Sequence, residues 1–291
     1  MTQKILRIVF SCVLSLFAAI LLLAVGLSHY AKTNICEPTV LLHATENSNY
    51  LDQLHSEIQY DWENLLSITG INQPDDIMVL LTPELVKEDA VSYITSAYTA
   101  TANLDTNPLR TQLTEKINEY IQAQNISGYD EEELAQNISD LVDACIADYR
   151  SAVAIPLLPK LLGMASTIAG KLDLIILFAA VGTLFLFLFT FFLQVRRQDT
   201  LYYAAISFAA NGILLTSLTC LADHYTWIER LPFEDSALKT LVNTYLATLA
   251  SKLQQYGYLY FITAAVILLS YLLICAIIAC LRKYRVEKQY P

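Results

Sequence analysis

The residue types that most often perform catalysis or bind metals are few in this chain. The four histidines, His29, His43, His55 and His224, show no repeated metal-ligand spacing. The eight glycines form neither a phosphate-binding loop nor a nucleophile elbow. The sequence therefore predicts no catalytic residue, no cofactor and no metal site, and it gives no support for an enzymatic function.

The six cysteines contain one pair that could react together. Cys36 and Cys145 are the two that fall clearly outside the apolar segments, one just after the first segment and the other shortly before the second. If the region between the two segments begins and ends at the same membrane surface, these thiols could form a disulfide at its base. The alternative is two reduced cysteines in a core. Cys275 and Cys280 have no zinc or redox spacing and are interpreted as packing residues.

Two further groups of polar residues have a simple structural interpretation. Asp130 and the three glutamates that follow it lack the spacing of a calcium loop, and they suit the positive end of a helix dipole. Asn125-Ile-Ser and Asn137-Ile-Ser match the glycosylation sequon, a match that matters only in a eukaryotic source. Neither group indicates a specific activity.

Polar chemistry inside the apolar segments centres on one amide. The middle of each segment lacks Asp, Glu, Lys, Arg and His, with Asp173 and His29 near the edges, whereas pumps usually place an ionisable group there. Asn211 lies in the middle of the third segment on a surface of small residues, which also contains Ala205, Ala209, Gly212 and Thr216. Such a surface lets helices approach closely, so we interpret it as a packing face. A permeation or substrate role for this surface is the alternative.

Four apolar segments must position these residues. They are Ile8–Leu27, Leu172–Val195, Leu201–Leu221 and Leu259–Leu281. Each is about 20 residues or longer, which as a helix spans a hydrocarbon core of roughly 30 Å. Because runs such as Leu184–Phe192 are apolar on all sides, a β-barrel with alternating strands is excluded. The predicted class is an all-α integral membrane protein with four transmembrane helices.

The distribution of basic residues predicts the orientation. Residues 1–7, 194–200 and 282–291 contain eight of the 18 lysines and arginines, which places both termini in the cytoplasm and the large region 30–171 outside. The cell membrane is the expected location. A cleavable signal peptide is the alternative interpretation of the first segment, because small residues near Ala24 suit a cleavage site.

The chain then divides into five parts by topology. Residues 1–29 form the N-terminus and first span, 30–171 an acidic extracytoplasmic helical domain, and 172–222 the second and third spans with a basic hairpin. Residues 223–258 form a helical outer loop, and 259–291 the fourth span and a basic tail. Region 30–171 has 21 acidic and seven basic residues, so nucleic acid is not an expected partner.

Helical periodicity dominates the two outer regions. We predict amphipathic helices over 45–69, from Thr82-Pro83 to about residue 101, from Asn107-Pro108 to near Gly128, and from Asp130 onward. A further helix should run from about Lys160 into the second span. From Ser236 an apolar stripe continues into the fourth span, which predicts one helix of about 50 residues extending outside the bilayer. The acidic domain or a partner should cover its upper part.

These patterns favour a function in recognition. The first hypothesis is a non-enzymatic scaffold, sensor or accessory subunit that contacts the lipid bilayer and engages a protein partner through its outer helices. The alternative is a homo-oligomeric channel or transport subunit, in which Asn211, Thr216 and Ser217 face a pathway. Self-association is compatible with both hypotheses.

Overall fold

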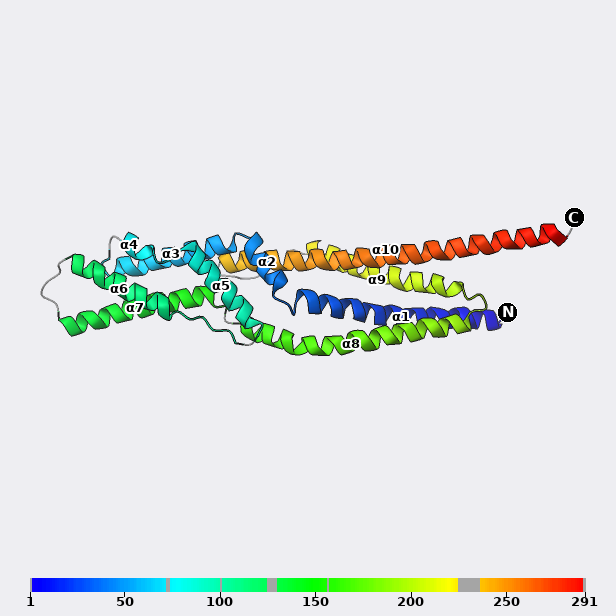
Figure 1. Cartoon of the computed structure of the whole chain (residues 1–291), viewed down its shortest axis with the longest axis horizontal. Helices are drawn as coiled ribbons and strands as arrows, with labels where there is room; N and C mark the ends of the chain where they lie inside the picture. The colour runs from blue at the N-terminus through cyan, green and yellow to red at the C-terminus, as the bar shows by residue number, and fades with distance from the viewer. Residues whose placement is uncertain are drawn as a thin grey trace. The chain divides into compact units, whose positions relative to one another are not determined.

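The computed structural model describes residues 2–71, 74–99, 101–124, 130–155, 157–224 and 236–289, which form helices and no strand (Figure 1). The predicted all-α class is confirmed. Helices α1 (Thr2–Asn34), α8 (Leu158–Leu193), α9 (Asp199–His224) and α10 (Ser236–Gln289) contain four segments that are long and apolar enough to cross a membrane. Length and composition thus make this an integral membrane protein.

The chain forms two compact units. The membrane unit consists of Met1–Ile35, Ile168–Arg230 and Ala247–Pro291, and the acidic unit of Cys36–Thr167 and Leu231–Leu246. Among the described residues, six helices lie entirely within the acidic unit, to which the start of α8 also belongs: α2 (Thr39–Asn47), α3 (Tyr50–Ile68), α4 (Asp75–Met78), α5 (Pro83–Ala97), α6 (Asn107–Ala123) and α7 (Glu131–Val153). The first turns of α10 also belong to it.

Side-chain caps begin two of the predicted helices. The hydroxyl of Thr82 accepts a hydrogen bond from the backbone N–H of Leu85, three residues into α5, at 3.1 Å. The carboxylate of Asp130 accepts one from the N–H of Glu132 at 2.9 Å. These bonds satisfy N–H groups that have no partner inside the helix, which is why both helices begin where the sequence predicts.

The amphipathic helix predicted over 45–69 is confirmed as α3, but its predicted start was wrong, because α2 ends at Asn47 and α3 begins at Tyr50. Ser48 between them has extended backbone, and its hydroxyl accepts a hydrogen bond from the N–H of Tyr50 at 3.3 Å. Asn47, Ser48 and Asn49 are residues whose short polar side chains compete with helical hydrogen bonding. All five residues from Thr45 to Asn49 are polar, which is a signal for the interruption that the prediction missed.

One apolar core joins the helices of the acidic unit. Trp62 of α3 is completely buried, and its indole N–H donates to the carbonyl oxygen of Cys145 on α7 at 3.1 Å. Tyr149 of α7 is also buried and donates its hydroxyl to Asp89 of α5 at 2.6 Å. Ala237 and Leu241 of α10 are part of the same core. The expectation that the acidic domain covers the upper stripe of the long helix is therefore confirmed for these two residues.

Helices α1 and α9 form the main packed pair of the membrane unit. Ser15 lies against Ser207, and Ala19 lies against Asn211, four residues further along both helices. The two helices therefore run in the same direction. Helix α8 runs opposite to α1, since Lys32 near the end of α1 pairs with Asp173 near the start of the apolar part of α8. Helix α10 is one continuous helix of 54 residues, as the apolar stripe predicted.

Candidate functional site

Asn211 lies in the seam between α9 and α1. Its side chain is 3% exposed, and its Nδ2 donates to the carbonyl oxygen of Ala19 at 3.0 Å. That carbonyl is available because the small side chain of Ala19 lets α9 come close to the backbone of α1. The amide thus links two helices, and this donor is satisfied within the chain.

Two serines continue this seam toward the start of α1. The hydroxyls of Ser15 and Ser207 are 2.9 Å apart, and each also donates to a carbonyl of the opposite helix. One helical turn earlier, Gln194 donates to the hydroxyl of Ser11 at 2.6 Å. Sequence reasoning missed these serines. The available signal was the spacing of Ser11, Ser15 and Ala19, which places three small residues on one face of α1.

The small-residue surface of α9 divides into two faces. Asn211 and Ser207 face α1, whereas Gly212 and Thr216 face α10. A Cβ atom on Gly212 would lie 3.0 Å from the ring of Phe261, and a Cβ atom on Gly257 would lie 2.8 Å from Cγ2 of Thr216. These glycines permit a close approach that any other residue would obstruct. Ala205, on the stripe of Gly212 and Thr216, is buried, and Ala209 is half-buried.

Cys36 and Cys145 are both free thiols with different neighbours. Cys36 is half-buried near Tyr98 and Tyr245, and burial, followed by the charge of Glu37, raises its pKa. Burial and the nearby carboxylate of Asp148 raise the pKa of Cys145 to about 12. A disulfide between them stays a prediction. In the reduced form, Cys145 is a core residue rather than a reactive nucleophile, because the thiolate is the reactive form.

Asp148 is an acidic residue that faces the interior of the acidic unit. Its Oδ2 is buried without a hydrogen-bond partner, although the residue as a whole is half-buried. Burial, followed by the charge of Asp61 on α3, raises the pKa of this carboxyl to about 6. The sequence carried a signal for this position that we missed. Asp148 follows Leu141 and Cys145 at the spacing of the buried stripe.

The acidic unit has a groove between α3 and α7 with an apolar floor. Two adjoining cavities of about 490 and 270 Å³ share Thr69, Asn137 and Leu141. We call them together the α3–α7 groove. At its edge Ile68 is 83% exposed, which is high for an isoleucine in the last turn of a helix. Asp140 of α7 also lines the groove.

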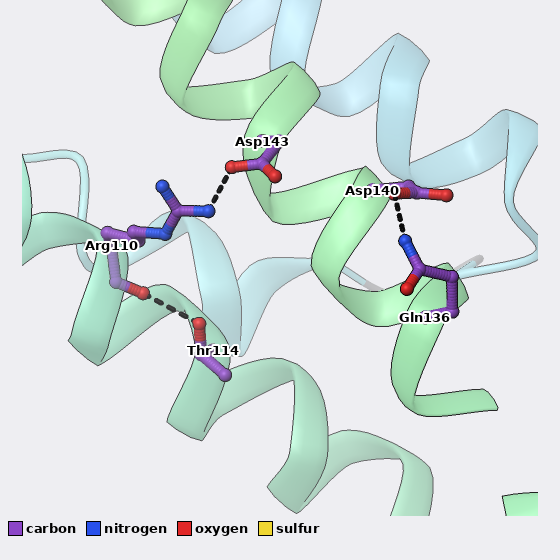
Figure 2. Close-up of polar contacts among 5 residues, drawn as sticks. All are labelled: Arg110, Thr114, Gln136, Asp140 and Asp143. Atoms are coloured by element: carbon purple, nitrogen blue, oxygen red, sulfur yellow. Dashed lines mark hydrogen bonds and ion pairs between the residues drawn. The ribbon is translucent and has the colours of Figure 1, made fainter. Parts of the chain in front are cut away.

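The two aspartates of this part of α7 have different partners (Figure 2). Asp143 forms an ion pair with Arg110 of α6, whose carbonyl oxygen accepts a hydrogen bond from Thr114. Asp140 points to Gln136 on its own helix and accepts a hydrogen bond from its amide at 2.8 Å. Gln136 is uncharged, so this hydrogen bond places no cation against Asp140. The groove therefore combines apolar area with one acidic side chain at its edge.

The remaining candidates add no reactive cluster. Within the described ranges, no group of three or more His, Cys, Asp or Glu side chains could hold a metal. The sequon at Asn125 and the side chain of His224 lie outside the described residues, while Asn137 is exposed on α7 and lines the groove. No protein family, curated protein or solved structure matches this chain. The function must therefore be argued from the chain itself.

Proposed function

We propose that this protein is a non-enzymatic membrane scaffold, sensor or accessory subunit that binds a partner protein through its acidic unit. The observation that carries the proposal is the α3–α7 groove, with the exposed side chain of Ile68 beside the carboxylate of Asp140. Exposed apolar area with a polar rim is typical of protein-binding surfaces. The matching partner is a segment with apolar residues on one face and basic residues beside them.

The orientation supports a partner outside the cytoplasm. Basic residues concentrate in 1–7, 194–200 and 282–291, and such segments are retained in the cytoplasm. In this arrangement the acidic unit is extracytoplasmic, both termini are cytoplasmic, and the plasma membrane is the expected location.

Site-specific photo-crosslinking in native membranes tests the groove directly. A photo-reactive amino acid replaces Ile68, and a matched variant carries it at Glu88, an exposed position on α5 outside the groove. We expect one discrete protein adduct at position 68 and none at 88. Asp140→Lys in the Ile68 probe should abolish the adduct, because it reverses the charge beside the groove. Equal adducts at both positions, or an adduct insensitive to the charge reversal, would contradict the proposal.

A flux measurement separates this function from a channel. Liposomes that contain only this chain should retain small ions, because the Asn211 amide donates to α1 and Thr216 donates to the carbonyl of Gly212 in its own helix. These contacts support a packing role for both side chains. Ion flux that Asn211→Ala alters would instead establish the channel alternative.

A further inference from the structure

Four pairs of residues define how α10 lies against α9. In every pair the two residue numbers have the same sum, which is the sign of a single antiparallel register. The pairs are Thr216 with Gly257, Gly212 with Phe261, Tyr202 with Tyr271, and Gln198 with Cys275. The register is therefore defined from the start of α9 to Thr216.

Both contact faces repeat every seven residues. On each, successive contact positions alternate between spacings of four and three, the period of a coiled-coil seam. The contact face of α9 consists of Tyr202, Ala205, Ala209, Gly212 and Thr216. Gln198, the residue just before α9, continues this face. The face of α10 consists of Gly257, Phe261, Ala264, Leu268, Tyr271 and Cys275. Because both faces share one period, a shift of seven residues brings the same faces together again.

The shifted register also pairs large side chains with small ones. If α10 moves by seven residues toward its own N-terminal end, Ala264 lies opposite Thr216 and Leu268 lies opposite Gly212. Tyr271 then takes the place of Ala264 opposite Ala209. A bulky residue against glycine or alanine is the pattern of the observed register too, where Phe261 lies against Gly212. Packing on this face is thus compatible with two positions of α10.

In the observed register, the apolar segments of α9 and α10 do not begin and end at the same positions along the helix axes. By the pairing above, Ile274 lies opposite Asp199, the first residue of α9. The apolar residues after Ile274 therefore extend past the connection between α8 and α9 (Figure 1). Among them, Ile277 is 50% and Leu281 59% exposed. At the other end Lys252 lies opposite the apolar Leu221.

A seven-residue shift removes this mismatch. It places Leu281 opposite Asp199 and Leu259 opposite Leu221, so that the apolar parts of the two helices coincide. The displacement is about 10 Å along the helix axis. A bilayer disfavours apolar helix outside its hydrocarbon core and charged residues within it. Hydrophobic matching therefore favours the shifted register.

Contacts with α1 favour the observed register. The hydroxyl of Tyr260 donates to the carbonyl oxygen of Leu22 at 2.6 Å, and its ring lies against Gly26. The hydroxyl of Tyr30 donates to the carbonyl oxygen of Leu249 at 2.8 Å. The shift would break both hydrogen bonds. Because α10 is one helix, the shift would also move Ala237 and Leu241 out of the core of the acidic unit. The observed register is thus stabilised by hydrogen bonds and by this core, and the shifted register by the bilayer.

We propose that α10 moves between these two registers along α9, and that bilayer thickness biases the choice. A thick bilayer covers the projecting end of α10 and stabilises the observed register, whereas a thin one stabilises the shifted register. Because α10 is one helix from Ser236 to Gln289, its displacement changes the position of its cytoplasmic residues. This movement does not depend on the identity of the partner proposed above.

Disulfide crosslinking of the full chain in liposomes measures the two registers. Ala209→Cys with Ala264→Cys reports the observed register, and Thr216→Cys with Ala264→Cys the shifted one. The native membrane cysteines are first replaced by alanine: Cys12, Cys220, Cys275 and Cys280. Linked peptides are quantified by mass spectrometry in dimyristoleoyl and in dierucoyl phosphatidylcholine. We expect the ratio of the two crosslinks to change by about fivefold or more toward the shifted pair in the shorter lipid.

Two controls make the result specific. Ile206→Cys with Ala264→Cys should remain unlinked, because Ile206 lies on a different face of α9 and is 43% exposed. Tyr260→Phe should raise the shifted crosslink in either lipid, whereas Tyr258→Phe should not, since Tyr258 bonds to Gln254 of its own helix. Three outcomes would overturn the proposal. They are a crosslink between positions 209 and 264 alone in both lipids, a crosslink ratio that does not depend on the lipid, and the absence of a crosslink in both pairs.

Discussion

Several buried polar side chains in this protein link neighbouring helices. Asn211 donates to a backbone carbonyl across the α1–α9 seam, Trp62 donates to another across α3 and α7, and Tyr149 donates to Asp89. Each bond satisfies a buried donor, which would otherwise destabilise the fold. Asp148 departs from this pattern, because one of its buried oxygens has no partner. The two predictions at this scale concern Asp148 and Asn211.

Asp148→Asn should stabilise the acidic unit at neutral pH. The folded-state pKa of about 6 lies above the ordinary value of 3.8, so the folded state binds this proton more tightly than the unfolded state. Stability is therefore lost as the pH rises from about 4 to 6 and stays low above it. With allowance for solvent screening of a half-buried group, the gain in unfolding free energy at pH 7 should be about 1 kcal/mol.

Denaturant unfolding followed by Trp62 fluorescence, in a Trp227→Phe background, measures this gain as a function of pH. The difference between Asp148→Asn and the parent should disappear near pH 4. Asp140→Asn, a change on the exposed side of the same helix, serves as the control and should give no comparable pH-dependent gain. A gain that is constant from pH 4 to 8 would show that the charge of Asp148 is not its cause.

Asn211→Ala should destabilise the α1–α9 seam by about 1 kcal/mol, since it removes one interhelical hydrogen bond inside the membrane unit. Thermal unfolding in detergent should show a lower midpoint. Ser217→Ala, an exposed position on the same helix, should leave the midpoint unchanged. Equal midpoints for the two variants would argue against a packing role for the amide.

At the scale of helices, start signals were more predictable than interruptions. Thr82 and Asp130 cap α5 and α7 where the sequence places them, because an N-cap needs only one local side chain. The break between α2 and α3 was missed, although residues 45–49 contain no apolar side chain. The length of α10 was predicted, since no proline interrupts it from Ser236 onward.

Loss of the Thr82 cap should weaken α5 measurably. Thr82→Ala removes the hydrogen bond to the N–H of Leu85 and should lower the unfolding free energy of the acidic unit by about 1 kcal/mol. Thr95→Ala in the same helix is the matched control, because that hydroxyl bonds only locally to the carbonyl of Val91. The prediction fails if both variants have the same denaturation midpoint.

At the scale of the whole chain, charge and apolar content are separated along the sequence. Four apolar helices form the membrane unit, and the region with 21 acidic residues forms most of the other. Because of this separation, the apolar helices suit a bilayer and the acidic region suits water. Orientation in the membrane is the property of the whole chain that a labelling experiment can test most directly.

Thiol labelling of intact cells should give opposite results for the two sides. In a cysteine-free background, Glu131→Cys in the acidic unit should react with a charged, membrane-impermeant maleimide. Arg197→Cys in the α8–α9 connection should react only after the membrane is permeabilised, because basic loops remain cytoplasmic. Labelling of Arg197→Cys in intact cells would invert the proposed topology.

The helices and their apolar or polar surroundings were predictable from the sequence. Four segments of about 20 apolar residues have no stable alternative to helices in a bilayer, and local caps begin helices within a few residues. These properties depend on composition and near neighbours. The sequence predicted the candidate site only in part. Asn211 was identified because an amide is rare in an apolar segment.

The helix faces that contact one another became known from the packing of the folded chain. It directed Asn211 to α1 but Gly212 to α10, joined Ser15 with Ser207, and placed Asp148 where its charge is unfavourable. In a helix that is apolar on most sides, small residues such as Ser11, Ser15 and Ala19 indicate a contact face but do not identify the helix that packs on it. Partners far apart in the chain are selected by close packing and by the pairing of buried polar groups, which depend on all the helices together.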